Sequence, residues 1–193
     1  MKVAIIKYNA GNIRSVSFAL QRIGVDPIVT DNIEDLNAAD KIIFPGVGEA
    51  SSAMRYLRDK QLDKVISNFK QPVLGICLGM QLLCENSEEG NTDCLGVFKQ
   101  KVLRFSDANK VPQIGWNTIE NLNSKIFNRL KEQEFMYFVH GYYVEKSADT
   151  IATANYGIEY SAALQKENFY GVQFHPEKSS DAGQLIIENF LNL

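Results

Sequence analysis

The chain has 193 residues, 45% of them hydrophobic and 22% charged, which is the composition of an ordinary globular protein. Its 20 Lys and Arg side chains are intermixed with 23 Asp and Glu side chains, so the sequence has no basic stripe of the kind that follows a nucleic acid. The apolar run at the N-terminus ends at Lys7 and is too short for a signal sequence or a membrane span. We therefore expect a cytoplasmic protein that binds neither nucleic acid nor membrane.

The first half of the chain alternates strand-like and helical segments. Apolar runs of strand length occur at residues 3–7, 27–30, 41–44 and 73–76. Patterns of helical spacing lie at residues 13–23, 50–58 and 62–69, and Gly24 is expected to end the first of these helices. Repeated strand–helix–strand units predict a mainly parallel, doubly wound sheet of the flavodoxin-like kind, with helices on both faces.

The strand expected at 41–44 runs into Pro45-Gly46-Val47-Gly48. Glycines allow the backbone to approach a ligand closely, and successive N–H groups can form an anion-binding nest. Taken alone, this segment is better interpreted as a turn. It matches neither a dinucleotide-binding fingerprint nor a P-loop, so the sequence gives no support for a nucleotide site.

The strongest chemical signal is the G-I-C-L-G segment at residues 75–79, which follows the apolar run at 73–76 and opens a helical run. This is the nucleophile-elbow pattern with sulfur in place of oxygen. It places Cys77 at a helix N-terminus, which favours a thiolate, and directs the Leu78 N–H outward. A buried structural cysteine is the alternative, but the two flanking glycines favour a nucleophile. Together with Gly46, Val47 and Gly48, the Leu78 N–H could form an oxyanion hole.

The chain has two other cysteines, Cys84 and Cys94. The three spacings match no zinc or disulfide framework, and a reducing compartment would keep all three as thiols. We expect no chemical role for Cys84 or Cys94, and no metal ion or other cofactor.

After Gly90 the segments become rich in Val, Phe, Tyr and Thr, which predicts a mixed or antiparallel extension of the sheet. These strand-like segments lie at residues 97–105, 135–139, 151–154, 161–165 and 170–174. A helical pattern at 182–190 closes the chain, with Ser179, Ser180 and Asp181 as candidate N-caps. Since no linker-like composition divides the two halves, we expect one α/β domain over residues 1–193.

A thiolate nucleophile needs a base, and the base needs a group that orients it. His175-Pro176-Glu177 supplies both, directly after the strand expected at 170–174. Pro176 is a stiff spacer that could hold the Glu177 carboxylate against the imidazole. His140 is the only rival base, because the chain has two histidines, and it has no carboxylate next to it in sequence.

Three motifs in this order, P-G-V-G, G-I-C-L-G-M-Q and F-H-P-E, resemble the class I, or triad, glutamine amidotransferases. The resemblance spans nearly the whole chain. Within that family the likeness is closest to the glutaminase subunits of imidazole glycerol phosphate synthase, of histidine biosynthesis. The segments that carry this likeness lie at residues 8–16, 112–117, 138–143 and 175–180.

The resemblance implies that Cys77 attacks the side-chain amide of glutamine, that His175 moves the protons and that Glu177 steadies the imidazole. The ammonia released would pass to a partner cyclase in a heterodimer. Gln81 matches the family's glutamine-binding position, and Glu89 and Tyr142 are expected to help hold the amino acid, although a plain surface position describes Glu89 nearly as well.

Positions that face the cyclase in the family match Trp116, Tyr137 and Lys178. Asn12, in the segment at residues 8–16, is assigned to the same interface. An exposed aromatic ring and a lysine could equally be ordinary surface.

Two positions depart from the family pattern. Lys7 stands where an acid is common, and Gly141 stands where a serine or threonine hydroxyl is common beside the glutamine pocket. The second departure bears on glutamine affinity and on control by the partner, and neither touches the triad.

Three other functions remain open on the sequence. The chain could be a paralogous subunit that feeds ammonia to another synthase, for example one acting on a sugar nucleotide. It could be a stand-alone cysteine hydrolase or peptidase. A binding subunit with a decayed site is the third possibility, and the intact Cys77, His175 and Glu177 argue against it.

Overall fold

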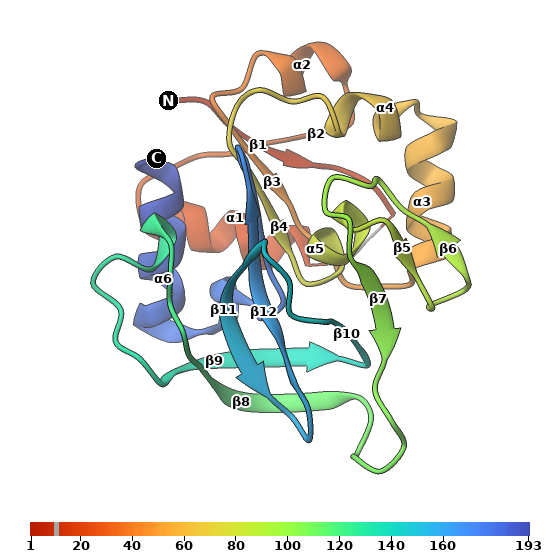
Figure 1. Cartoon of the computed structure of the whole chain (residues 1–193). Coiled ribbons are helices and arrows are strands. Elements are labelled where there is room, and N and C mark those ends of the chain that lie inside the picture. Colours follow the sequence, from red (N-terminus) through yellow and green to blue (C-terminus); the bar gives the residue numbers. More distant parts are fainter. Residues whose placement is uncertain (10–11) are drawn as a thin grey trace.

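The computed structural model describes residues 1–9 and 12–193. Its centre is a seven-stranded sheet (Figure 1). The strands of this sheet are β1 (Val3–Ile6), β2 (Ile28–Thr30), β3 (Lys41–Phe44), β4 (Val73–Ile76), β11 (Thr150–Asn155), β12 (Glu159–Lys166) and β13 (Phe169–Val172). They lie in the order β11-β12-β13-β4-β3-β1-β2. The five strands from β13 to β2 are parallel, and β12 and β11 extend the sheet antiparallel, as the sequence predicts.

Helices cover both faces of this sheet. The longer ones are α1 (Ile13–Arg22), α3 (Ala50–Asp59) and α6 (Ser180–Leu191), and the shorter ones are α2 (Ile33–Asn37), α4 (Leu62–Ile66), α5 (Leu78–Leu83) and the 3-10 turns η1 (Lys125–Phe127) and η2 (Pro176–Lys178). Alternate residues of β1 show why two layers form, because Val3 and Ile5 pack with α1 and α6, whereas Ala4 and Ile6 pack with α2 to α5.

Two helix predictions need correction. The sequence does not predict helix α2, because its five residues bury only Leu36 and so show no helical pattern. The helix begins at Asn32, whose side chain accepts hydrogen bonds from the backbone N–H groups of Glu34 and Asp35. Ser179 precedes α6, but its side chain makes no cap bond. The Ser179 hydroxyl instead donates to the His175 carbonyl at 2.6 Å.

The remaining strands form two further sheets, so the segments predicted at 97–105 and 135–139 lie outside the central sheet. One has the order β10-β7-β5-β6, and the other is a two-stranded antiparallel ribbon of β8 and β9. Their strands are β5 (Asn86–Ser87), β6 (Thr92–Asp93), β7 (Lys101–Arg104), β8 (Gln113–Ile119), β9 (Glu134–His140) and β10 (Tyr142–Val144). Strand β8 was not among the predicted strands, and it pairs along its whole length with β9.

The register of the parallel strands decides where functional side chains gather. Ile76, at the end of β4, pairs with Val172, at the end of β13. On the other side of β4, Gly75 pairs with Phe44, at the end of β3. The chain segments that follow these three strands therefore leave the sheet at one edge, where ligands bind in doubly wound folds.

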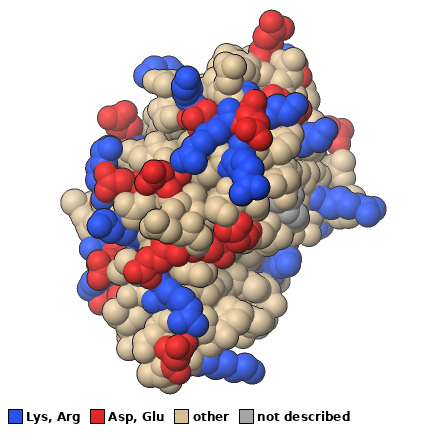
Figure 2. Space-filling model, turned by 90° about the vertical axis from the view of Figure 1, so that its right-hand side faces the viewer, with Lys and Arg blue, Asp and Glu red and all other residues tan. Residues whose placement is uncertain are grey.

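The outer surface carries charges of both signs. Figure 2 views the face on the right-hand side of Figure 1, where α3 and β6 lie, and basic and acidic side chains are interspersed across it. None of the helices within residues 1–9 and 12–193 is long and apolar enough to cross a membrane.

Helix α6 packs so closely on η2 that only a glycine fits at the contact. A Cβ atom on Gly183 would overlap the carbonyl oxygen of Pro176. We predict that Gly183→Ala lowers the free energy of unfolding by about 1–3 kcal/mol, the usual cost of overpacking, in urea denaturation followed by circular dichroism. Gln184→Ala, one residue along the same helix, is the control and should change it by less than about 0.5 kcal/mol. Equal effects of the two substitutions would contradict this packing argument.

Candidate active site

Cys77 lies in a tight turn between β4 and α5. Its backbone has φ 51° and ψ −108°, a conformation that non-glycine residues rarely adopt. The glycines on either side are sterically required, since a Cβ on Gly79 would overlap the carbonyl oxygen of Phe44 and one on Gly75 would lie 2.8 Å from the Met80 nitrogen. The sequence thus fixes a nucleophile elbow, and the strain is held by close packing on β3.

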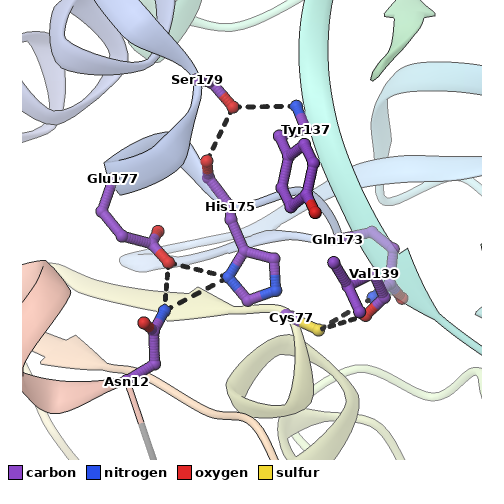
Figure 3. Close-up of polar contacts among 8 residues, drawn as sticks. All are labelled: Asn12, Cys77, Tyr137, Val139, Gln173, His175, Glu177 and Ser179. Atoms are coloured by element: carbon purple, nitrogen blue, oxygen red, sulfur yellow. Dashed lines mark hydrogen bonds and ion pairs between the residues drawn. The ribbon is translucent and has the colours of Figure 1, made fainter. Parts of the chain in front are cut away.

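His175 and Glu177 form a buried pair next to this turn. The Nδ1 atom of His175 lies 2.8 Å from a Glu177 carboxylate oxygen. The other ring nitrogen, Nε2, is buried and has no hydrogen-bond partner within the described part of the chain. In Figure 3 the imidazole lies between Glu177 and Cys77, with Nε2 on the side of the sulfur. The structure therefore brings together all three residues of the predicted triad.

Asn12 joins this group from the loop before α1. Its amide nitrogen donates to the same carboxylate oxygen of Glu177 and lies 3.4 Å from the His175 Nδ1 atom (Figure 3). The sequence analysis assigns Asn12 to the partner interface and gives no sign of this contact with the triad. Its only sequence signal is its place directly before a helix. The preceding Ala10 and Gly11, part of the same motif, lie outside the described residues.

The two histidines have opposite electrostatic environments. Burial by itself would lower the pKa of His175, but the neighbouring Cys77 sulfur and the Glu177 carboxylate raise that pKa to about 10. Burial lowers the pKa of His140 to about 4. His140 is held by the Tyr142 carbonyl at 2.7 Å and the Tyr160 hydroxyl at 3.3 Å, so it is a neutral wall residue and not the rival base.

The Cys77 sulfur has two further polar neighbours. Its distance to the Val139 carbonyl oxygen is 3.7 Å, and the Gln173 amide nitrogen lies 3.6 Å from it (Figure 3). Sequence reasoning did not single out Gln173. The available signal was a polar side chain inside the apolar run that leads to His175. Burial raises the pKa of Cys94 to about 12 and that of Cys84 further still, so both remain neutral thiols near pH 7.

The sulfur opens into a pocket of about 240 Å³. Gln81, Glu89 and Tyr142, predicted to bind glutamine, all line it, together with Val47, Gly48, Cys77, Leu78, Pro112, Val139, His140 and Gly141. Burial raises the pKa of Glu89, whose carboxylate also accepts a hydrogen bond from the Ala50 N–H at 2.9 Å. A larger hollow between α1 and α6 contains no nucleophile, so the smaller pocket is the candidate site.

The predicted oxyanion hole differs from expectation in one respect. Val47, Gly48 and Leu78 line the pocket as anticipated. However, the Leu78 N–H does not point freely into it but donates to the Gly46 carbonyl at 3.3 Å. The Tyr8 hydroxyl holds the adjacent Pro45 carbonyl, which fixes the segment in this orientation. In this conformation one donor of the hole is occupied by the protein itself.

Three of the four residues predicted to face a partner, Trp116, Tyr137 and Lys178, gather at one face of the β8–β9 ribbon, whereas Asn12 lies against Glu177. Trp116 and Tyr137 are directly paired across it, with their rings 5.9 Å apart, and the Lys178 ammonium lies 6.0 Å from the Tyr137 ring. Ile114 and Phe135 on the same face are 63% and 58% exposed, and Trp116 is 54% exposed. This apolar patch, made of Ile114, Trp116, Phe135 and Tyr137, is called the ribbon patch below.

Metal ligands do not cluster anywhere in the residues that the structure describes. Among them, His, Cys, Asp and Glu side chains form no group of three that could hold a metal ion.

Comparison with known proteins agrees with this geometry. The family model for glutamine amidotransferase class-I matches residues 5–193. The imidazole glycerol phosphate synthase subunit HisH of Bacteroides fragilis strain YCH46 is 57% identical, over 100% of both chains. HisH of Haemophilus influenzae strain Rd is 44% identical, over 99% of this chain and 97% of its own. A crystal structure described as a glutamine amidotransferase superimposes with a TM-score of 0.77 at 18% identity, covering 98% of this chain and 99% of that one.

The contrast between the two histidines can be measured directly. At pH 7 we predict a protonated His175 and a neutral His140, with NMR titration midpoints near pH 10 and pH 4 respectively. The spectrum of His140→Asn lacks the ring signals of His140, so the remaining histidine signals belong to His175. Glu177→Gln should move the His175 midpoint down, because it removes the carboxylate that favours the imidazolium. An His175 midpoint near its ordinary value in the unaltered protein would contradict the charged pair.

The same shifts predict how stability depends on pH. The folded-state pKa of His175 lies above its ordinary value of 6.5. Protonated His175 therefore adds to the free energy of unfolding in full below pH 6.5, and this contribution is lost as the pH rises towards about 10. For His140 the folded-state pKa is depressed, so stability is lost as the pH falls from 6.5 towards about 4.

Proposed function

The chain belongs to the class I glutamine amidotransferases, and on this basis we propose that it is the glutaminase subunit of imidazole glycerol phosphate synthase. It hydrolyses glutamine to glutamate and ammonia and passes the ammonia to a cyclase subunit in histidine biosynthesis. The observation that carries the chemistry is the imidazole of His175, tied to Glu177 through Nδ1 and turned towards the Cys77 sulfur through Nε2. We propose one amidotransferase domain, residues 1–193, acting in the cytoplasm.

The residues suggest the following sequence of steps. The Cys77 thiolate attacks the side-chain amide carbon of glutamine, and the C–N bond breaks as His175 gives its Nε2 proton to the departing ammonia. A thioester between Cys77 and the glutamyl group remains. Neutral His175 then takes a proton from water, which attacks the thioester, and glutamate leaves as the thiolate is restored. Glu177, itself held by Asn12, keeps the imidazole in place throughout.

Glutamine would lie in the 240 Å³ pocket with its amide over Cys77. Gln81, Glu89 and Tyr142 are the proposed contacts of the amino acid. Glu89, a partly buried carboxylate, suits the ammonium group of the substrate. Gly141 also lines the pocket, and a Cβ atom added to it would lie 3.4 Å from the Val111 side chain. Because Gly141 lacks the hydroxyl that is common at this position, glutamine binding depends more on Gln81, Glu89 and Tyr142.

The cyclase would bind at the ribbon patch. Exposed aromatic and aliphatic side chains on one face of a two-stranded ribbon are typical of a protein interface. Lys178 lies beside this patch and Tyr137 within it, so both are proposed interface residues, with Trp116 as the main anchor. Asn12 is proposed to act at the boundary between this surface and the triad.

The alternative functions share the triad and differ in the partner. A paralogous subunit would bring its ammonia to a different synthase, such as one acting on a sugar nucleotide. A stand-alone hydrolase would need a ready oxyanion hole, whereas the Leu78 N–H here is engaged by Gly46. That contact favours an enzyme whose activity is low until a partner subunit binds.

Removing the sulfur tests the assignment of the nucleophile. We predict that Cys77→Ala abolishes glutamate release in the presence of the cyclase while leaving the circular dichroism spectrum and cyclase binding unchanged. Cys94→Ala is the control and should retain activity, because that thiol lies outside the pocket. Turnover by the Cys77 variant would refute the mechanism.

Dependence on the partner is a separate prediction. The isolated chain should release glutamate slowly, because removing one oxyanion donor typically costs about 10²–10³ in kcat. Adding the imidazole glycerol phosphate synthase cyclase should raise kcat by a similar factor, whereas a cyclase from a sugar-nucleotide pathway should not. Full activity of the single chain would contradict the idea that the Gly46 carbonyl blocks the hole.

A further inference from the structure

We propose that Gln173 is a further catalytic residue, whose side-chain amide donates a hydrogen bond to the Cys77 sulfur and thereby favours the thiolate. We propose in addition that Gln81 is a positioning residue that orients this amide. Both statements rest on the proposed glutaminase function for their role in turnover. The contacts themselves do not depend on it.

The orientation of the amide follows from a chain of three contacts. The Gln81 Nε2 atom donates to the Tyr142 backbone carbonyl at 3.2 Å, and a carbonyl can only accept. This contact shows which end of the Gln81 amide is the nitrogen. The same nitrogen lies 2.9 Å from the Gln173 side chain. The Gln173 atom at that contact must be the acceptor oxygen, so the Gln173 nitrogen faces Cys77 at 3.6 Å.

An N–H group directed at sulfur acts mainly on one protonation state. A neutral thiol is a poor acceptor, whereas a thiolate accepts readily. The thiol has its own acceptor, the Val139 carbonyl at 3.7 Å. The contact with Val139 favours the thiol and is lost with the proton, whereas the contact with Gln173 is strengthened. Of these two neighbours, Gln173 is therefore the one that stabilises the thiolate that attacks the substrate, in addition to the charge of His175.

Rigid backbone holds both partners of this bond. Gln173 is fully buried, and its N–H donates to the Ala162 carbonyl in the neighbouring strand at 2.8 Å. The residue before it, Val172, accepts the Cys77 N–H at 2.7 Å. The donor and the sulfur are thus fixed across the same pair of strands, and little side-chain freedom remains for Gln173.

The contact chain also reaches the substrate. Gln81 and Tyr142 line the pocket that we propose for glutamine, so an occupant there touches the residues that aim the Gln173 amide. A change in Gln81 should then alter both glutamine binding and thiol reactivity, whereas a change in Gln173 should alter mainly reactivity and kcat.

The test compares the reactivity of the thiol in the full chain. Gln173→Met keeps the length of the side chain and removes the donor, and Gln173→Glu keeps an acceptor for Gln81 but places oxygen next to sulfur. We expect iodoacetamide to alkylate Cys77 about tenfold more slowly in both variants at pH 7, since hydrogen bonds to charged groups are roughly twice as strong as neutral ones. Cys77→Ala gives the background from the other thiols.

Kinetics with the cyclase present complete the test. Gln173→Met should lower kcat about tenfold with KM nearly unchanged, the pattern of an interaction that matters in the reaction and not in substrate binding. Gln81→Met should raise KM as well as lower kcat. Circular dichroism and thermal unfolding of each variant show which are folded.

Either Gln173 variant, once shown to be folded, overturns the proposal if it is alkylated at the rate of the unaltered chain. If both variants unfold, Gln81→Met decides, because it leaves Gln173 in place and should still slow alkylation. An unaltered chain that fails to hydrolyse glutamine even with the cyclase present, but whose alkylation slows on substitution of Gln173, would refute the proposed function and leave the sulfur contact standing.

Discussion

The structure depends on the in-register parallel pairing of β4 with β13. Ile76 and Val172 end their strands side by side, and the Cys77 N–H donates to the Val172 carbonyl at 2.7 Å. The chain then leaves both strands at the same edge of the sheet, which brings Cys77 and His175 together although they are far apart in sequence. A slip of one residue in this register would turn the side chains of β13 to the opposite face and separate the imidazole from the sulfur.

Electrostatics at this edge differ sharply between residues of the same type. His140 and His175 are both buried, and burial alone disfavours a charged imidazole in each. Only His175 has an acid on one side and a sulfur on the other, and these neighbours reverse the direction of its pKa shift. The environment therefore suits His175 to the proton transfer that we propose and leaves His140, tied to Tyr142 and Tyr160, as part of the pocket wall.

Local signals explain which features could be predicted from the sequence. The elbow around Cys77 is encoded by glycines two residues to each side, and the parallel strands by short apolar runs, so both were predicted with nearly correct limits. Contacts made across the sheet carry no local signal. The place of Asn12 against Glu177, the bond from Gln173 to the sulfur and the bond from Leu78 to Gly46 all join residues that only the tertiary fold brings together.

Strand β9 connects the ribbon patch to Cys77 and His175. Tyr137 belongs to that patch, and its backbone accepts the His175 N–H at 2.9 Å and donates to the Ser179 hydroxyl at the same distance. Two residues on, the Val139 carbonyl faces the Cys77 sulfur. Because β9 carries part of the proposed docking surface, a bond to the His175 backbone and an acceptor of the Cys77 thiol, a partner that shifts this strand would change the geometry around the sulfur. The strand is thus a physical route by which binding outside the pocket can alter chemistry within it.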